Sequence, residues 1–154
     1  MALDEFDRKI LAELQVDGRL SLTDLATKVS LSLSPCHRRV RALEQSGVIQ
    51  GYSAHLDSAK VGLDFSAIVF VTLREVNRDS VEVFEQAVSA IHEIVLAQRL
   101  FGDTDYMLHV VSQSLETFQM LYDDKLTALP SILRLNSTLV MKTVVQNRPL
   151  PLGK

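Results

Sequence analysis

Positively charged side chains are concentrated in one short stretch of the chain, from Ser34 to Gly47 (SPCHRRVRALEQSG). Four of the five residues from His37 to Arg41 are histidine or arginine, in a chain of 154 residues whose net charge is −3. Guanidinium groups donate paired hydrogen bonds to the O6 and N7 atoms of guanine and to phosphate oxygens. The chemistry that this stretch favours is therefore contact with nucleic acid.

A helix through this stretch would separate its side chains onto two faces. At 100° per residue, Cys36, Val40 and Leu43 fall within about 60° of one another and form an apolar face. The face opposite carries groups that reach phosphates or base edges, so our candidates for the DNA groove are Ser34, His37, Arg38 and Arg41. A charged helix face is ordinarily only solvated, but such faces usually alternate the sign of their charges. This one has no carboxylate before Glu44.

Two residues of the stretch have other interpretations. Arg39 lies on the remaining flank, beside the apolar face, where it either contacts DNA or braces the fold. Cys36 and His37 are adjacent, so on a helix they point about 100° apart and cannot form a thiolate–imidazolium pair with each other. A small buried apolar side chain is the favoured reading of Cys36.

Three short helices are predicted to position the basic stretch. The first covers residues 3–17, and the second begins at Ser21, a residue type that caps helix N-termini. The third is predicted to begin with Ser34 as its N-cap, to carry Pro35 at its first helical position and to end at Gly47. A tight turn before the third helix completes the outline of a helix-turn-helix.

Hydroxyl groups flank this helix-turn-helix at the places where it would meet a phosphate backbone. Ser21 and Thr23 open the second helix, and Ser32 lies in the turn that follows it, so all three are candidates for phosphate contacts. After Gly47, the segment from Val48 to Tyr52 fits a short strand or wing. A polar connector follows it.

From Leu63 onward the pattern is that of a sheet covered by helices. The strand predicted from Leu63 to Val76 is apolar on both alternating faces, so both faces should be covered. The later elements are expected as a helix at Val81–Ile91, strands at Ile94–Phe101 and Tyr106–Val111, a helix at Leu115–Leu129 and a strand at Ile132–Gln146. This β-α-β-β-α-β order is the ferredoxin-like plan.

The fold class predicted is therefore α+β. We expect an N-terminal winged helix-turn-helix domain at residues 1–50, a linker or hairpin strand at 51–62, and a ferredoxin-like βαββαβ domain at 63–154.

Composition places the protein among ordinary globular proteins and suggests a compartment. The chain is 47% hydrophobic and 23% charged, and it has no apolar run near the ~18 residues of a membrane span. The acidic start MALDEFDRK does not resemble a signal peptide. A single cysteine excludes an internal disulfide framework and fits a reducing environment. We therefore expect a cytoplasmic protein without a membrane partner.

Several motifs together resemble the leucine-responsive/asparagine regulator (Lrp/AsnC) family of transcription factors. The matching pieces are D-R-K-I-L at 7–11, D-G-R at 17–19, S-P-C-H-R-R-V-R-A-L-E at 34–44, G-V-I-Q-G-Y at 47–52 and F-G-D-T-D-Y-M-L-H-V-V at 101–111. Each piece alone would be weak, but the combination is specific and the resemblance covers essentially the whole chain.

The resemblance implies function and assembly that composition does not show. Members of this family are homodimers that commonly assemble into tetramers or octamers, with the sheets of the second domain forming the dimer core. A dimer would cover the second apolar face of the strand at residues 63–76. Members of the family bind operator double-stranded DNA with two helix-turn-helix units per dimer. The second domain would be an ACT-like effector-binding module, and the effector is usually an amino acid.

By resemblance, the effector site lies in the loop before the strand at Tyr106. Its expected residues are Leu100, Gly102, Asp103, Thr104, Asp105 and Tyr106, with further contacts from Ser137 and Thr138 in the last strand. A carboxylate of the loop could accept from an α-ammonium group, and loop N–H groups could receive an α-carboxylate. The alternative is that G-D-x-D is only a hairpin turn whose aspartates bond local N–H groups. Both readings can hold together.

Other functions have less support in the sequence. We find no nucleophile–base pair and no Gly-rich phosphate loop, so a ferredoxin-like enzyme is a poor alternative and no cofactor is expected. Two carboxylates do not complete a metal shell, and His55, His92 and His109 lack ligand spacing, so no metal site is expected. The remaining alternative is an architectural DNA-organising protein of low sequence specificity.

Overall fold

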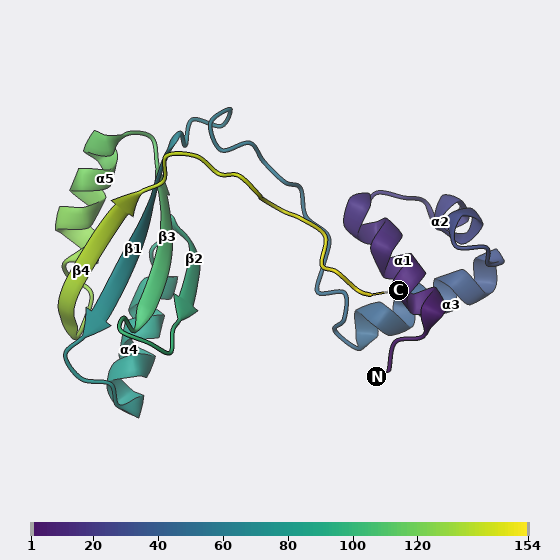
Figure 1. Ribbon diagram of the computed structural model, residues 1–154, viewed down its shortest axis with the longest axis horizontal. Helices are drawn as coiled ribbons and strands as arrows, with labels where there is room; N and C mark the ends of the chain where they lie inside the picture. Colours follow the sequence, from purple (N-terminus) through teal and green to yellow (C-terminus); the bar gives the residue numbers. More distant parts are fainter. Residues whose placement is uncertain (1, 154) are drawn as a thin grey trace. The chain divides into compact units, whose positions relative to one another are not determined.

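The structure, a computed structural model, describes residues 2–153 and divides into two compact units (Figure 1). The first unit holds the residues up to His55 together with the segment from Val145 onward, and the second unit is Leu56–Val144. The predicted domain of residues 63–154 differs from this division at its C-terminal end, because the tail packs with the first unit.

The first unit contains three helices around one core. They are α1 (Glu5–Val16), α2 (Leu22–Lys28) and α3 (Leu33–Gln45). Ser21 caps α2, as predicted, because its hydroxyl accepts a hydrogen bond from the Asp24 N–H at 3.0 Å. Gly47 follows α3 with φ +75°, the left-handed conformation that ends helices and that glycine adopts without strain, so this helix end is also confirmed.

The start of α3 was predicted two residues too late. The N-cap is Ser32, and Ser34 lies in the first turn of the helix rather than at the cap. Pro35 consequently occupies the third helical position. The N–H groups of the first turn have no partner within a helix, so proline is tolerated at any position there and does not fix the start.

The strand or wing expected from Val48 to Tyr52 is absent from the described residues, which are irregular there. The N–H of Ile49 instead donates to the carbonyl of Leu43 at 3.0 Å and turns the chain back toward the core of the first unit. A strand needs a partner for its backbone groups, and residues 2–55 and 145–153 offer no second strand.

The second unit confirms the β-α-β-β-α-β order. Its elements are β1 (Phe65–Leu73), α4 (Arg78–Ser89), β2 (Ile94–Arg99), β3 (Tyr106–Ser112), α5 (Leu115–Leu121), the π-helix η1 (Tyr122–Leu126) and β4 (Ile132–Leu139). The strands form one antiparallel sheet in the order β2-β3-β1-β4. The last strand ends at Leu139 rather than at Gln146, because pairing with β1 stops at Ala67 opposite Leu139.

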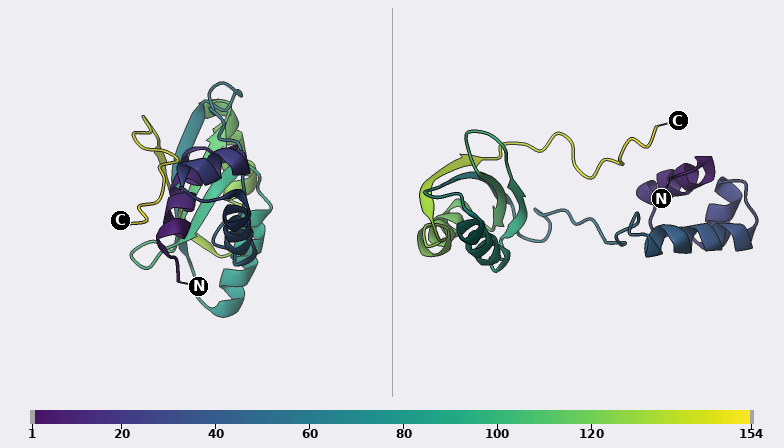
Figure 2. Two further views of the ribbon diagram at one scale, coloured as in Figure 1. Left: turned by 90° about the vertical axis from the view of Figure 1, so that its right-hand side faces the viewer. Right: turned by 90° about the horizontal axis from the view of Figure 1, so that it is seen from below.

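Both faces of β1 are apolar, as predicted, but only one is covered. Helices α4 and α5 lie on the same face of the sheet (Figure 2). The core lies between them and the sheet, where Val69 and Val71 of β1 are fully buried beside Phe84 of α4. On the other face, Ile68 and Phe70 remain partly exposed. We call this second surface the open face of the sheet.

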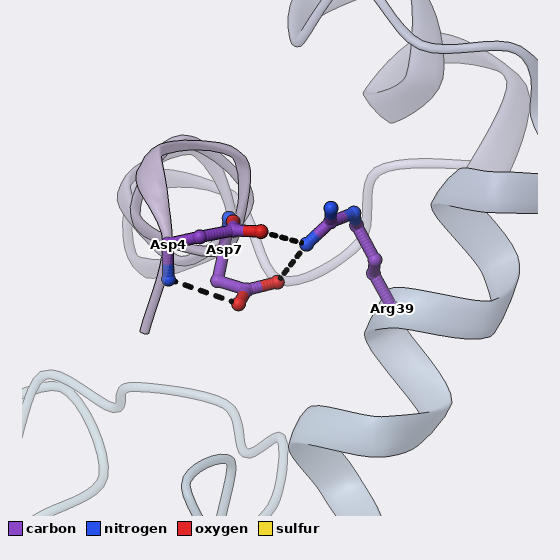
Figure 3. A network of polar contacts seen from close by, with 3 residues as sticks. All are labelled: Asp4, Asp7 and Arg39. Atoms are coloured by element: carbon purple, nitrogen blue, oxygen red, sulfur yellow. Dashed lines mark hydrogen bonds and ion pairs between the residues drawn. The ribbon is translucent and has the colours of Figure 1, made fainter. Parts of the chain in front are cut away.

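A polar network fixes α3 against α1 inside the first unit (Figure 3). The Arg39 guanidinium donates to Asp4 Oδ2 at 2.7 Å and to Asp7 Oδ1 at 2.8 Å. Asp4 and Asp7 also form the capping box of α1. The pKa of the Asp4 carboxyl is lowered because the Asp7 N–H and the Arg39 guanidinium both donate to its ionised form. Arg39 additionally lies over the Phe6 ring, 5.4 Å from its centroid.

This network predicts a stability loss for Arg39→Ala. The substitution leaves the buried Asp7 carboxylate without its guanidinium donor, which should lower the free energy of unfolding by about 1–2 kcal/mol in urea melts at neutral pH. The pKa of Asp4 is lowered in the folded state, so its ionised carboxylate stabilises the fold at pH values above its ordinary pKa of 3.8. This contribution to stability is lost as the pH falls through the lowered pKa.

The neighbouring Arg38→Ala variant is the matched control, because that side chain is exposed and makes no ion pair within the described chain. We expect its unfolding free energy to stay within about 0.5 kcal/mol of the wild type. Equal stability of the Arg39→Ala and Arg38→Ala variants would contradict a bracing role for Arg39.

Candidate nucleic-acid interface and ligand site

Helix α3 is amphipathic in the way that its sequence predicts. Cys36 and Leu43 are fully buried and Val40 nearly so, and they pack against α1 and α2. The DNA candidates on the opposite face, Ser34, His37, Arg38 and Arg41, are all exposed. Burial raises the pKa of the Cys36 thiol, which keeps it protonated and supports its reading as a packing residue.

The arginines of α3 divide into two kinds. Arg39 is 28% exposed and bound to two carboxylates, so the geometry supports its bracing role. The side chains of Arg38 and Arg41 make no ion pair or hydrogen bond with any part of the described chain. Their guanidinium donors are therefore available to an external acceptor.

The hydroxyl candidates for phosphate contacts are also exposed, but their present roles differ. The Ser21 hydroxyl accepts the Asp24 N–H and so serves as a helix cap. Ser32 is the N-cap of α3, yet its side chain makes no cap hydrogen bond, which leaves the hydroxyl free. Thr23 is exposed in the first turn of α2. Ser32 and Thr23 are thus the better placed of the three for a contact with another molecule.

The loop between β2 and β3 is tied to the end of β1 by Asp105. The Asp105 N–H donates to the carbonyl of Val71 at 2.8 Å, and the Asp105 carboxylate accepts from the N–H of Leu73 at 2.7 Å. The Leu100 N–H closes the loop on the Asp105 carbonyl at 2.8 Å. The Asp105 carboxylate therefore ties the loop to β1, and not to N–H groups of its own turn as the hairpin-turn alternative expected.

The remaining loop residues are differently placed. Phe101, Gly102 and Asp103 are exposed, and Thr104 is half-buried. A Cβ on Gly102 would meet nothing within 4 Å, so the loop leaves space there. Phe101 is fully exposed, an unusual position for a phenylalanine.

Tyr106, by contrast, points into the second unit. Its ring is 3% exposed, and its hydroxyl donates to Glu85 of α4 at 2.7 Å. Burial and this hydrogen bond raise the pKa of Tyr106 to about 12. The phenol is thus a packing group that anchors α4, and of the expected effector residues it is the one directed away from the loop surface.

Ser137 and Thr138, the two candidates from β4, lie on opposite faces of the sheet. Ser137 pairs with the buried Val69 and lines a hollow of about 310 Å³ beside α5, together with Phe118 and Tyr122. Thr138 pairs with Ile68 on the open face. No residue of the Leu100–Tyr106 loop lines that hollow, so Ser137 and the loop do not share this cavity within one chain.

Sequence reasoning missed a second hollow, of about 470 Å³, beside the N-terminal half of α4. It is lined by side chains of both charge signs, Arg78, Glu82, Glu85 and Arg99, and by Val76, Asn77 and Val81. Arg78, Glu82 and Glu85 share one face of α4 at helical spacing, but Arg99 comes from β2, and no spacing in the sequence connects it to them.

The described residues give no support for a metal site or for a membrane-spanning helix. Within 2–153 there is no group of three or more histidine, cysteine or acidic side chains that could hold a metal ion. His109 instead faces Ser66 across β1 and β3, with 2.5 Å between its Nε2 atom and the serine Oγ. None of the helices described is long and apolar enough to cross a membrane.

Known proteins match both units of the chain. Residues 3–50 match the winged helix-turn-helix DNA-binding family model, and residues 66–150 match the Lrp/AsnC ligand binding domain. The Bkd operon transcriptional regulator of Pseudomonas aeruginosa is 39% identical over 150 residues, covering 97% of this chain and 98% of the relative. The leucine-responsive regulatory protein of Escherichia coli K12 is 40% identical over 151 residues, covering 96% and 90%.

A solved structure extends the likeness to three dimensions. A transcriptional regulator from Neisseria meningitidis, crystallised with L-methionine, has a TM-score of 0.92 and 34% sequence identity, and the match covers 98% of this chain and 97% of that one. The match therefore covers both the helix-turn-helix unit and the four-stranded α+β unit. The chain belongs to the Lrp/AsnC family of transcriptional regulators, with a DNA-binding helix-turn-helix unit and an Lrp/AsnC ligand-binding unit.

Proposed function

We propose that this regulator binds operator DNA as a homodimer through the exposed face of α3, and that an amino acid modulates its assembly or its DNA affinity. The observation that carries the DNA-binding part is the pair of unpartnered guanidinium groups, Arg38 and Arg41, beside the exposed His37 and Ser34. Arginine side chains in this setting read guanine in the major groove, while hydroxyls such as those of Ser32 and Thr23 contact phosphates. A DNA-binding regulator of this kind would work in the cytoplasm.

Substitution of the free arginines tests the groove assignment. Arg38→Ala and Arg41→Ala should each weaken binding to the operator by about 1–3 kcal/mol, because each would remove a base or phosphate contact. Binding is measured by fluorescence anisotropy at fixed salt, on a site selected from random DNA.

The matched control is Arg78→Ala, which removes one exposed arginine from α4 of the other unit. Its affinity should stay at the wild-type level. Unchanged affinity in both α3 variants would remove α3 from the interface. A preference for the selected site well below ~10³ over random DNA would instead support an architectural DNA-organising role.

We further propose that the open face of the sheet forms the dimer interface. Ile68 and Phe70 of β1, with Met107 and Val111 of β3, place four apolar side chains on this face, and each is only partly buried in the single chain. An apolar surface of this kind is stabilised when a second copy removes it from water. Two such dimers would then form a tetramer, and four would form an octamer.

A charge placed on the open face should prevent dimer formation. Phe70→Asp would bury an unpaired carboxylate at the interface, so sedimentation velocity should show a monomer where the wild type is a dimer or larger. Val83→Asp on α4, where valine is 53% exposed, is the control that should leave assembly unchanged. If Phe70→Asp kept the wild-type sedimentation coefficient, the open face would not be the interface.

The ligand site, in our proposal, combines the Leu100–Tyr106 loop of one copy with residues of another. This is supported by the hollow that Ser137 lines, to which no loop residue contributes, and by the exposed residues Phe101 to Asp103 at the loop tip. Relatives are named for leucine and crystallised with L-methionine, so apolar amino acids are the first ligands to examine. The Asp103 carboxylate is the free acceptor for an α-ammonium group.

Calorimetry with leucine, methionine and the other standard amino acids tests this site. Asp103→Asn should abolish or greatly weaken the binding heat, because it neutralises the acceptor without disturbing the hydrogen bonds that Asp105 makes to β1. Asp79→Asn, an exposed acid in the first turn of α4, is the control. Wild-type heats for Asp103→Asn would exclude this carboxylate from the site.

A further inference from the structure

The C-terminal segment belongs to the first unit and is held on α1 by specific hydrogen bonds. The Gln15 side chain contacts both backbone polar groups of Leu150: the Leu150 N–H donates to Gln15 Oε1 at 2.6 Å, and Gln15 Nε2 donates to the Leu150 carbonyl at 3.2 Å. About two turns nearer the N-terminus of α1, the Arg8 guanidinium donates to the carbonyl of Leu152.

Apolar packing accompanies these bonds at only one of the two leucines. Leu152 is half-buried and packs against the core of the first unit. Leu150 presents its backbone to Gln15 but leaves its side chain 72% exposed. The tail is therefore bound by its backbone at both leucines, and by a packed side chain only at Leu152.

The sequence of the tail suits this mode of binding. In the segment Pro149-Leu150-Pro151, the two prolines have no N–H and restrict the chain to extended conformations, so little conformational entropy is lost when it docks. Leu150 carries the single N–H of the three residues, and Gln15 accepts it. Every backbone donor in this stretch thus has a partner.

The tail also joins the two units a second time. The chain passes from the first unit to the second near His55 and returns near Val144. The return begins directly after β4, whose last bond to the sheet is from the Val140 N–H to the Ser66 carbonyl at 2.9 Å. The DNA-binding unit is therefore connected to the ligand-binding unit by two segments of the chain, one before β1 and one after β4.

We propose that the α1 surface formed by Arg8, Gln15 and the apolar patch around Leu152 is a docking site for the C-terminal segment of the same chain. The docked tail acts as a second tether that restricts the motion of the helix-turn-helix unit and transmits changes at β4 to α1. The DNA-related part of this inference rests on the proposed function, whereas the docking itself does not.

A second tether has a defined effect on a protein that binds two half-sites. After one helix-turn-helix unit binds, the second binds in an intramolecular step, whose effective concentration depends on how far that unit is confined. Loss of the docked tail should therefore weaken binding to paired half-sites. A single half-site should be unaffected, because the hydrogen bonds of the described tail residues go to Arg8 and Gln15 of α1 and none involves Arg38 or Arg41.

Two serine substitutions in the tail form a matched test in the full-length protein. Leu152→Ser removes the packed side chain, and Leu150→Ser removes an exposed one while its backbone bonds remain. Hydrogen exchange of the α1 and tail amides should accelerate in Leu152→Ser and stay at the wild-type rate in Leu150→Ser. Gln15→Ala, which removes both bonds to Leu150, should accelerate exchange of the Leu150 amide without removing core packing.

The same variants are then measured on operator DNA. We expect Leu152→Ser to lose about tenfold or more in affinity for paired half-sites, and less than about twofold for a single half-site, with Leu150→Ser at wild type on both. Equal exchange in Leu152→Ser and Leu150→Ser would overturn the docking site. Equal losses on paired and single sites would overturn the tether, since the tail would then only stabilise the helix-turn-helix fold. If the wild type bound neither DNA, the proposed function would fail while the exchange result still decided the docking.

Discussion

One constraint organises the second unit: both faces of β1 are apolar, so both must be removed from water. The strand is central, with β3 on one side and β4 on the other, so its backbone groups are satisfied within the sheet. One face is buried by α4 and α5, and Val69 and Val71 become part of the core. The other face, with Ile68 and Phe70, is completed by a second copy in the dimer that we propose. The same strand also fixes the candidate ligand loop, because Asp105 bonds to Val71 and Leu73 at its end.

The first unit uses charge for two separate purposes within one helix. Arg39 is paired with Asp4 and Asp7 and orients α3 against α1, whereas Arg38 and Arg41 are exposed and are the groups that we propose to contact DNA. These roles depend on each other, because a base-reading side chain is effective only when the helix that carries it is held in place. The buried Cys36 and Leu43 supply the apolar contacts, and the ion pairs add direction to them.

The ligand site and the tail tether that we propose meet where β4 ends. Ser137 and Thr138 lie in this strand, and the chain that leaves it reaches α1 through the docked tail. A ligand that moves the end of β4 would therefore act on the DNA-binding unit through the tail that follows this strand. Such a ligand would change the fraction of molecules in which the DNA-binding unit is confined. The connector after His55 gives a second path, but no side-chain clamp comparable to Gln15 is found along its described residues.

The sequence by itself determined what depends on neighbours along the chain. Helical spacing separated Cys36, Val40 and Leu43 from Arg38 and Arg41, and the cap chemistry of Ser21 and Gly47 located two helix ends, because these signals lie within a few residues. The order of strands and helices followed from the same local periodicity. The family motifs located the candidate ligand loop, whose contacts still await their test.

The tertiary structure alone decided which groups meet across the fold. Segment 48–52 forms no strand and β4 stops at Leu139, because a strand extends only as far as a partner pairs with it. Tyr106 points to Glu85, and adjacent Ser137 and Thr138 separate onto two faces, since sheet register sets the direction of each side chain. The docking of Leu150 and Leu152 on α1 joins residues more than a hundred positions apart, and no spacing in the sequence could reveal it.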